Sequence, residues 1–198
     1  EPYHERKVTL LNGPHTVLSP VSFLSGINIV RDACQHPVIG KYIHKVMFEE
    51  LMETLNLPKD ELKKFAEDVL ERFNNPFVDH AVTSIMLNSF PKYQTRDLPG
   101  LKTYLERKGE LPKGLVLGLA AIITYYKGGI REDGVEITPN DAPEIMQLLK
   151  DLWATNDTLK VVQGVLGNTA IWGEDLNQIP GLTVAVKANL DSIKERGM

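Results

Sequence analysis

The sequence has 198 residues and a formal net charge of −4, with 42% hydrophobic and 24% charged residues. This length and composition predict one soluble globular domain. Lysines and arginines are dispersed among carboxylates and do not form the one-signed patch that phosphate binding requires, so we expect no nucleic-acid partner.

The chain has one cysteine, Cys34, which excludes an intrachain disulfide and a zinc site built on Cys/His spacing. Its longest apolar stretch, residues 115–126, is shorter than the about 20 residues that a membrane span needs. We therefore expect a reducing, cytoplasmic setting, no metal and no membrane partner. Because the chain begins at Glu1 and not at a methionine, we also expect it to be part of a longer polypeptide.

Apolar residues recur with helical spacing along the chain, which predicts an all-α fold in one domain covering residues 1–198. Asn12-Gly13-Pro14 is expected to break the chain into separate segments, and Pro20 to bend the helix that follows. The helices that we expect cover residues 15–34, 42–56, 57–73, 79–87, 98–108, 113–127, 142–155, 159–171 and 182–196. The sequence "GGIREDGVEIT" predicts at most one short hairpin, with Asp133-Gly134 as its turn.

Three polar residues, Lys7, Asn12 and His15, surround the expected break. On an unbroken α-helix Lys7 and Asn12 would point about 140° apart, because five steps of about 100° separate them. A break at Gly13-Pro14 would remove this constraint and let the three side chains meet at a helix start.

This trio suits the chemistry of carbonyls and alcohols. A lysine whose pKa is lowered by burial can exchange a proton with an alcohol or its ketone. An asparagine can donate to the oxygen on which negative charge develops, and a histidine can orient the lysine. The hydride would need a separate acceptor, and no G-x-G-x-x-G motif for nicotinamide binding occurs in the chain.

Each of the three residues also has an ordinary structural explanation. Asn12 is well placed to cap a helix that starts near Pro14. Lys7 would otherwise be a solvated lysine, and His15 a hydrogen-bonded core residue. The alternative to an enzyme is therefore a non-catalytic helical interaction module.

The spacing Lys7-x-x-x-x-Asn12-x-x-His15 resembles the signature of the polyol-specific long-chain dehydrogenases, the mannitol dehydrogenase family. The resemblance implies that Lys7 is the general acid/base, Asn12 an oxyanion donor, and His15 the residue that positions lysine and substrate. It also implies an N-terminal Rossmann domain, absent from this chain, that binds NAD and supplies a second catalytic asparagine. This chain would be the helical C-terminal substrate domain and would be inactive alone.

Within the family, three segments are most similar to the members that interconvert tagaturonate and altronate. The segments are "PYHERKVTLLNGPHT", "RFNNPFVDHAVTSIMLNSFPKYQTRDLPGL" and "IPGLTVAVKANLDSIKERGM". The resemblance therefore implies a sugar-acid substrate, with fructuronate or mannitol and fructose as alternatives.

Lys92 matches a substrate-contacting lysine of mannitol dehydrogenases, but the residues before it depart from that pattern. Asn88–Phe90 replaces their "DGS", and Ser84 and Leu87 stand where they have an arginine and a histidine. A uronate presents a carboxylate, for which Lys92 and Arg96 are reasonable partners. By residue type alone, both would be surface charges.

A domain separated from its partner should expose apolar surface where the partner docks. We expect Tyr3, Leu10 and Leu11 to form such a surface around the catalytic trio, which should lie in an open half-cleft.

Overall fold

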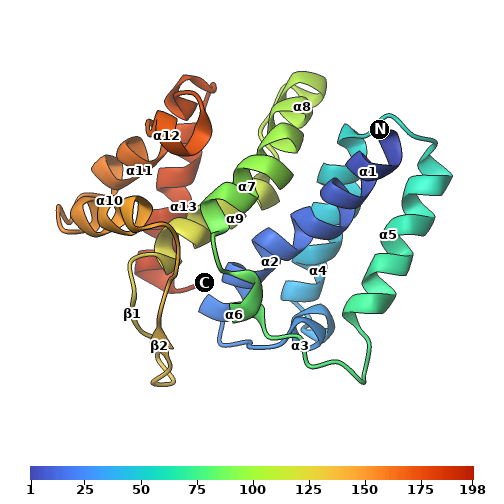
Figure 1. Cartoon of the computed structure of the whole chain (residues 1–198), viewed down its shortest axis with the longest axis horizontal. Helices are drawn as coiled ribbons and strands as arrows, with labels where there is room; N and C mark the ends of the chain where they lie inside the picture. The colour runs from blue at the N-terminus through green and yellow to red at the C-terminus, as the bar shows by residue number, and fades with distance from the viewer.

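The computed structural model describes residues 1–198 as an assembly of packed helices with one small hairpin (Figure 1). The helices are, in chain order, α1 (Pro2–Lys7), η1 (Val8–Asn12), α2 (Gly13–Leu24), α3 (Val30–Gln35), α4 (Ile39–His44), η2 (Lys45–Leu51), η3 (Met52–Thr54), α5 (Lys59–Phe73), α6 (Val82–Ile85), α7 (Ser89–Arg96), α8 (Leu98–Lys108), α9 (Lys113–Tyr125), α10 (Pro143–Trp153), α11 (Thr158–Leu166), α12 (Thr169–Trp172), η4 (Leu176–Gln178) and α13 (Leu182–Arg196). Elements η1 and η2 are π-helical, and η3 and η4 are 3₁₀-helical. None of these helices combines the length and the apolar character that crossing a membrane requires.

The hairpin pairs β1 (Gly129–Ile130) with β2 (Glu136–Ile137) in antiparallel register, with Gly129 opposite Ile137. Arg131 holds it to the helices, since its guanidinium donates to the carbonyl of Phe23 at 3.0 Å. The predicted all-α fold with one short hairpin is confirmed.

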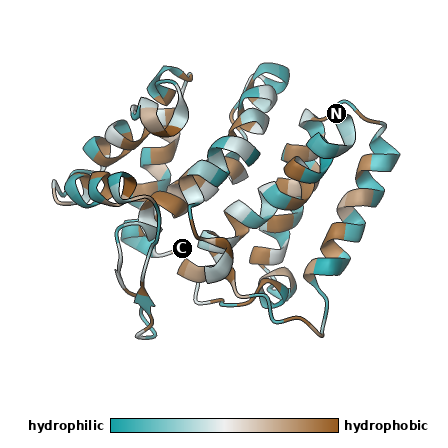
Figure 2. Ribbon diagram, in the orientation of Figure 1, coloured by the Kyte–Doolittle hydropathy of each residue, from teal (hydrophilic) through white to brown (hydrophobic).

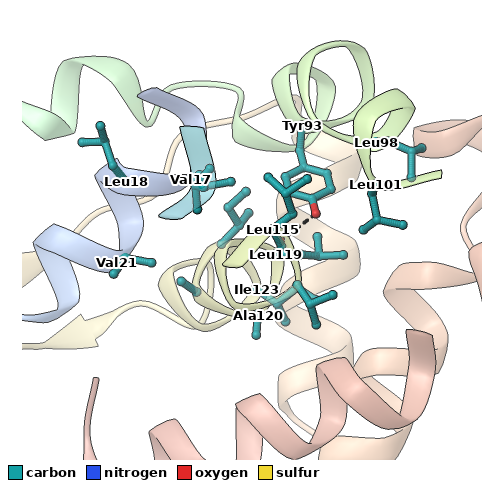
Figure 3. Close-up of a cluster of buried hydrophobic side chains, with 14 of the residues drawn as sticks. Val17, Leu18, Val21, Tyr93, Leu98, Leu101, Leu115, Leu119, Ala120 and Ile123 are labelled. Atoms are coloured by element: carbon teal, nitrogen blue, oxygen red, sulfur yellow. Dashed lines mark hydrogen bonds between the residues drawn. The ribbon is translucent and has the colours of Figure 1, made fainter. Parts of the chain in front are cut away.

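Helix α9 forms the centre of the hydrophobic core. Its apolar sequence has no polar face, as expected for a helix that is covered on all sides. Side chains of α2, α7 and α8 surround it in Figure 3. A side chain at Gly118 would collide with Val17 of α2, because an added Cβ would lie 2.5 Å from the Val17 Cγ1. The glycine therefore permits the close approach of α2 and α9.

The buried amino end of α9 is capped by a side chain from a distant helix. The carboxylate of Glu50, in η2, accepts hydrogen bonds from the backbone N–H groups of Gly114 at 2.9 Å and Leu115 at 3.0 Å. These are among the N–H groups that a helix start leaves without intrahelical partners. Burial raises the pKa of Glu50, although the two N–H donors act in the opposite direction.

The outer helices are amphipathic, as α5 illustrates. Leu62, Ala66, Val69 and Phe73 recur on one face and are buried, and Figure 2 shows hydrophilic and hydrophobic residues alternating along its turns. The expected start at Pro58–Asp60 is confirmed.

Two expected helices are divided in the structure. The expected helix 15–34 ends at Leu24, because Gly26 adopts a left-handed conformation with φ of 83°. The expected helix 159–171 is split where Asn168 caps α12 by accepting the N–H of Ile171.

Two further expectations around residue 90 were wrong. The helix expected over 79–87 is reduced to α6, and α7 was not expected at all. Pro91 lies in the first turn of α7, where a proline is tolerated.

We expect Glu50→Ala to lower the free energy of unfolding by about 3 kcal/mol, because two buried N–H groups lose their acceptor. Urea unfolding measures this loss. The matched control is Glu49→Ala, which removes an exposed carboxylate from the same helix and should change stability by no more than about 0.5 kcal/mol. Equal effects of the two substitutions would contradict the capping role.

Candidate active site

The segment that carries Lys7, Asn12 and His15 is one continuous helical stretch, so the expected break at Asn12-Gly13-Pro14 was wrong. Val8 and Gly13, at the two junctions, both have right-handed helical dihedrals. The N–H of Gly13 donates to the carbonyl of Val8, five residues earlier, which defines the π turn of η1. In a regular α-helix the ring of Pro14 would clash with the carbonyl of Leu10, and Leu10 lies inside the widened turn.

Ideal helix geometry predicts that the π turn rotates the three side chains towards one face. It links residues i and i+5, so Lys7 and Asn12 take the relation of an (i, i+4) pair, about 40° apart instead of about 140°. His15 follows three residues later, which places it about 60° back from Asn12. All three therefore lie within an arc of about 60°, on a helix that does not break.

Asn12 does not cap a helix. Its backbone is helical, its side chain makes no capping hydrogen bond, and its carbonyl accepts the hydroxyl of Thr16 at 3.0 Å. The half-buried side chain has no hydrogen-bond partner within the chain. The structural explanation that sequence offered for this residue therefore does not hold.

His15 is held between two aromatic rings at the edge of a small cavity. Its imidazole stacks on Phe73 with ring centroids 4.2 Å apart and meets the edge of His80 at 5.5 Å. The cavity has a volume of about 150 Å³ and is also lined by Leu11 and Val78. Burial lowers the pKa of His15 to about 4, and His80 and Arg96 add to this effect. The ring is therefore neutral at pH 7, with one nitrogen that donates and one that accepts.

Helix α7 brings two cationic side chains towards this face. The guanidinium of Arg96 donates to the Thr16 hydroxyl at 3.3 Å and lies close enough to His15 to lower its pKa. Lys92 precedes Arg96 by one turn, and its ammonium donates to the Ile85 carbonyl at 2.7 Å. Burial, and then Arg96, lower the pKa of Lys92.

The expected site residues are thus brought together unequally. Arg96 lies close enough to His15 to lower its pKa, and Lys92 precedes Arg96 by one turn on α7. Lys7 is exposed and makes no hydrogen bond or ion pair within the chain. Its catalytic role, and those of the other four residues, remain predictions.

Sequence reasoning missed the residues that support this face from outside the helix. Phe73 and His80 come from α5 and the segment after it, and nothing in their local sequence indicated contact with His15. Asp97 is fully buried, and an added Cβ on Gly13 would lie 2.9 Å from its Oδ1. Gly13 therefore permits close packing and does not break the helix. Burial raises the pKa of Asp97, whose carboxyl oxygens have no hydrogen-bond partner.

The expected apolar surface is only partly present. Leu10 is fully buried, contrary to expectation, and Leu11 is half-buried. Tyr3 is exposed, and the Cζ atom of Arg6 lies over its ring, 5.1 Å from the ring centroid. The most exposed large apolar side chain of the whole chain is instead Phe77.

Comparison with known proteins identifies relatives over the full chain. Residues 1–194 match the family described as the mannitol dehydrogenase C-terminal domain. The chain is 86% identical over 197 residues to an altronate oxidoreductase of Bacteroides thetaiotaomicron, and 40% identical over 199 residues to one of Bacillus subtilis. It is covered completely in both cases but spans only 41% and 40% of these relatives.

A solved structure has the same fold. The mannitol 2-dehydrogenase of Pseudomonas fluorescens, in a ternary complex with NAD and D-mannitol, is similar with a TM-score of 0.87 and 24% identity. The match covers 99% of this chain and 39% of that protein.

The low pKa of His15 predicts a specific dependence of stability on pH. An unfolded chain takes up a proton near pH 6.5, whereas folded His15 does so only near pH 4. Stability should therefore be complete above pH 6.5 and fall by up to about 3 kcal/mol as the pH drops towards 4. His15→Gln should flatten this part of the profile, measured by urea unfolding between pH 4 and 7. Parallel profiles for parent and variant would show that His15 is not held neutral.

Proposed function

Since this chain belongs to the family of mannitol dehydrogenase C-terminal domains, we propose that it is the substrate-binding and catalytic part of an NAD-dependent oxidoreductase that interconverts tagaturonate and altronate. One observation supports the chemistry: the π turn lies between Lys7 and His15, and ideal helix geometry then puts Lys7, Asn12 and His15 on one face. The altronate oxidoreductases at 86% and 40% identity support the choice of substrate.

The trio accounts for proton movement at the reacting oxygen. When the ketone is reduced, the ammonium of Lys7 donates a proton to the oxygen as it becomes a hydroxyl. The side-chain amide of Asn12 donates a hydrogen bond to the same oxygen and stabilises the negative charge that develops there. In the oxidative direction neutral Lys7 takes the proton back.

His15 contributes orientation. Because its ring is neutral at pH 7, it can accept a hydrogen bond from Lys7 or from a substrate hydroxyl and donate another. Stacking on Phe73 fixes the plane of the ring, so these directions are set before substrate binds.

Arg96 and Lys92 account for recognition of a sugar acid. A guanidinium offers paired donors that match a carboxylate. Lys92 uses one of its three N–H donors on the Ile85 carbonyl, which leaves two for substrate. Asp141 acts electrostatically on Lys92, and Asp97 on Arg96. The carboxylate of a uronate would add an anion that both cations can contact.

The dinucleotide does not fit within this chain. Dinucleotide sites are built on parallel sheets with a glycine-rich turn, whereas the only sheet here is the two-stranded antiparallel hairpin. When bound by the remaining part of the polypeptide, NADH supplies the hydride for the carbonyl carbon. The isolated chain is therefore expected to be inactive.

The direct test is to assay the full-length protein with NADH against tagaturonate, fructuronate and fructose. We expect the highest kcat/KM for tagaturonate. Preference for fructuronate or fructose would transfer the proposal to a related dehydrogenase. No reduction of any of the three would favour a non-catalytic interaction module.

We expect Lys7→Ala in the full-length protein to lower kcat by about 10²- to 10⁴-fold with little change in KM, because the variant loses proton transfer and retains most substrate contacts. Steady-state kinetics with tagaturonate measure both constants. Lys64→Ala, which removes an exposed lysine of α5, is the control and should behave as the parent. Unchanged kcat in Lys7→Ala would remove this lysine from the mechanism.

We expect Arg96→Ala to raise the KM for tagaturonate roughly thirtyfold, which corresponds to about 2 kcal/mol for a lost carboxylate partner. Fructose has no carboxylate, so its KM should change much less. The ratio of the two changes separates recognition of the carboxylate from damage to the Thr16 contact, which would affect both substrates alike.

A further inference from the structure

The segment between α5 and α6, which we name the Asn74–His80 loop, exposes two consecutive apolar side chains. Phe77 is 93% exposed and Val78 is 52% exposed. Single exposed apolar residues are common on soluble proteins, but this pair includes the most exposed large apolar side chain of the chain.

The backbone of this loop is held firmly in place. Arg31, on α3, donates to the carbonyls of Asn75 at 3.3 Å and of Pro76 and Val78 at 3.2 Å, and also pairs with Asp79 at 2.6 Å. A single guanidinium thus ties four positions of the loop together.

Two further hydrogen bonds hold the backbone at Phe77 and at His80. The Asn75 side chain accepts the N–H of Phe77 at 2.9 Å. The carbonyl of His80 accepts the N–H of Val30 at 2.9 Å. Phe77 is therefore presented to solvent by an ordered backbone, which suits a binding anchor because little conformational freedom is lost on contact.

The loop borders the candidate active site directly. Val78 and His80 line the same cavity as His15, and the His80 ring touches the His15 ring. Phe77 also lines an open depression together with polar residues of α5, which are Asp68, Glu71 and Arg72. An apolar centre with a polar rim is the usual composition of a protein interface.

We propose that the Asn74–His80 loop is the docking surface for the part of the polypeptide that lies outside this chain, with Phe77 as the apolar anchor. The chain corresponds to 41% of a relative with which it shares 86% identity, and its family is described as a C-terminal domain. This inference rests on the proposed function. A hydride donor bound elsewhere must reach the carbon next to the oxygen served by Lys7, so the body that carries it must cover the face that the loop borders.

Thiol accessibility in the full-length protein tests the proposal. Phe77→Cys is compared with Val184→Cys, which places a thiol at a 74% exposed position of α13, and the parent reaction is subtracted. Cys34 should contribute little to that background, because burial raises the pKa of its thiol to about 11. We expect the thiol at position 77 to react with a soluble disulfide reagent at least about tenfold more slowly than the thiol at position 184.

Equal reactivity at the two positions would overturn the proposal. Slow reaction at position 77 that disappears when the protein is diluted would also overturn it, because a second copy of the molecule would then be the cover. The reductase assay on the parent is read separately. If the parent reduces tagaturonate but the thiol at position 77 reacts freely, only the docking surface is rejected. If that thiol is protected but the parent shows no reductase activity, only the proposed function is rejected.

Phe77→Asp provides a second readout that does not depend on a thiol. A carboxylate in an apolar contact should loosen the docked arrangement and lower kcat/KM with tagaturonate by at least about tenfold. Val184→Asp is the matched control and should retain the parent value. Retention of parent activity by Phe77→Asp would contradict the proposal.

Discussion

The buried amino end of α9 is the constraint on which the surrounding helices depend. The first N–H groups of a helix have no hydrogen-bond acceptors within the helix. Because α9 starts in the interior, other elements of the protein must supply these acceptors. Glu50 accepts two of these N–H groups. The hydroxyls of Tyr42 and Tyr93 donate to the carbonyls of Gly114 and Leu115, each at 2.8 Å.

These contacts also position the candidate active site. Tyr93 belongs to α7, and its bond to the start of α9 fixes the helix on which Lys92 and Arg96 stand, one residue before and three residues after it. The same requirement for hydrogen bonds that stabilises the core therefore determines where the two cations lie. Gly114 is essential to this arrangement, because an added Cβ would overlap the Glu50 carboxylate and lie 2.7 Å from the Val46 Cγ2.

The π turns of η1 and η2 have different roles within the same packed region. In η2 the turn contains Glu50, the cap of α9. In η1 the turn widens the helix just before Pro14, and the helix continues into the core through α2. A π turn disrupts regular hydrogen bonding, and such turns occur frequently at functional sites. Here the altered geometry accommodates a proline inside a continuous helix.

The candidate site is packed against the rest of the chain at His15 and exposed to solvent at Lys7. Phe73 stacks on His15, Thr16 accepts a hydrogen bond from Arg96, and Asp97 packs against Gly13, whereas Lys7 is exposed. The proposed docking of a second body over this face would cover Lys7, and the ordered Asn74–His80 loop lies at the border of the face.

The sequence by itself determined those features that depend on neighbouring residues. Apolar spacing and local start or stop signals located α5, α8, α9 and α13 with small errors, and the hairpin turn at Asp133-Gly134 was recognisable. The spacing of Lys7, Asn12 and His15 also indicated the family. Only the tertiary structure decided the surroundings of these residues. Gly13 packs closely against Asp97 within a continuous helix, and the orientation of His15 depends on Phe73 and His80. These partners lie more than 50 residues away along the chain, and local periodicity contains no information about contacts at such separations.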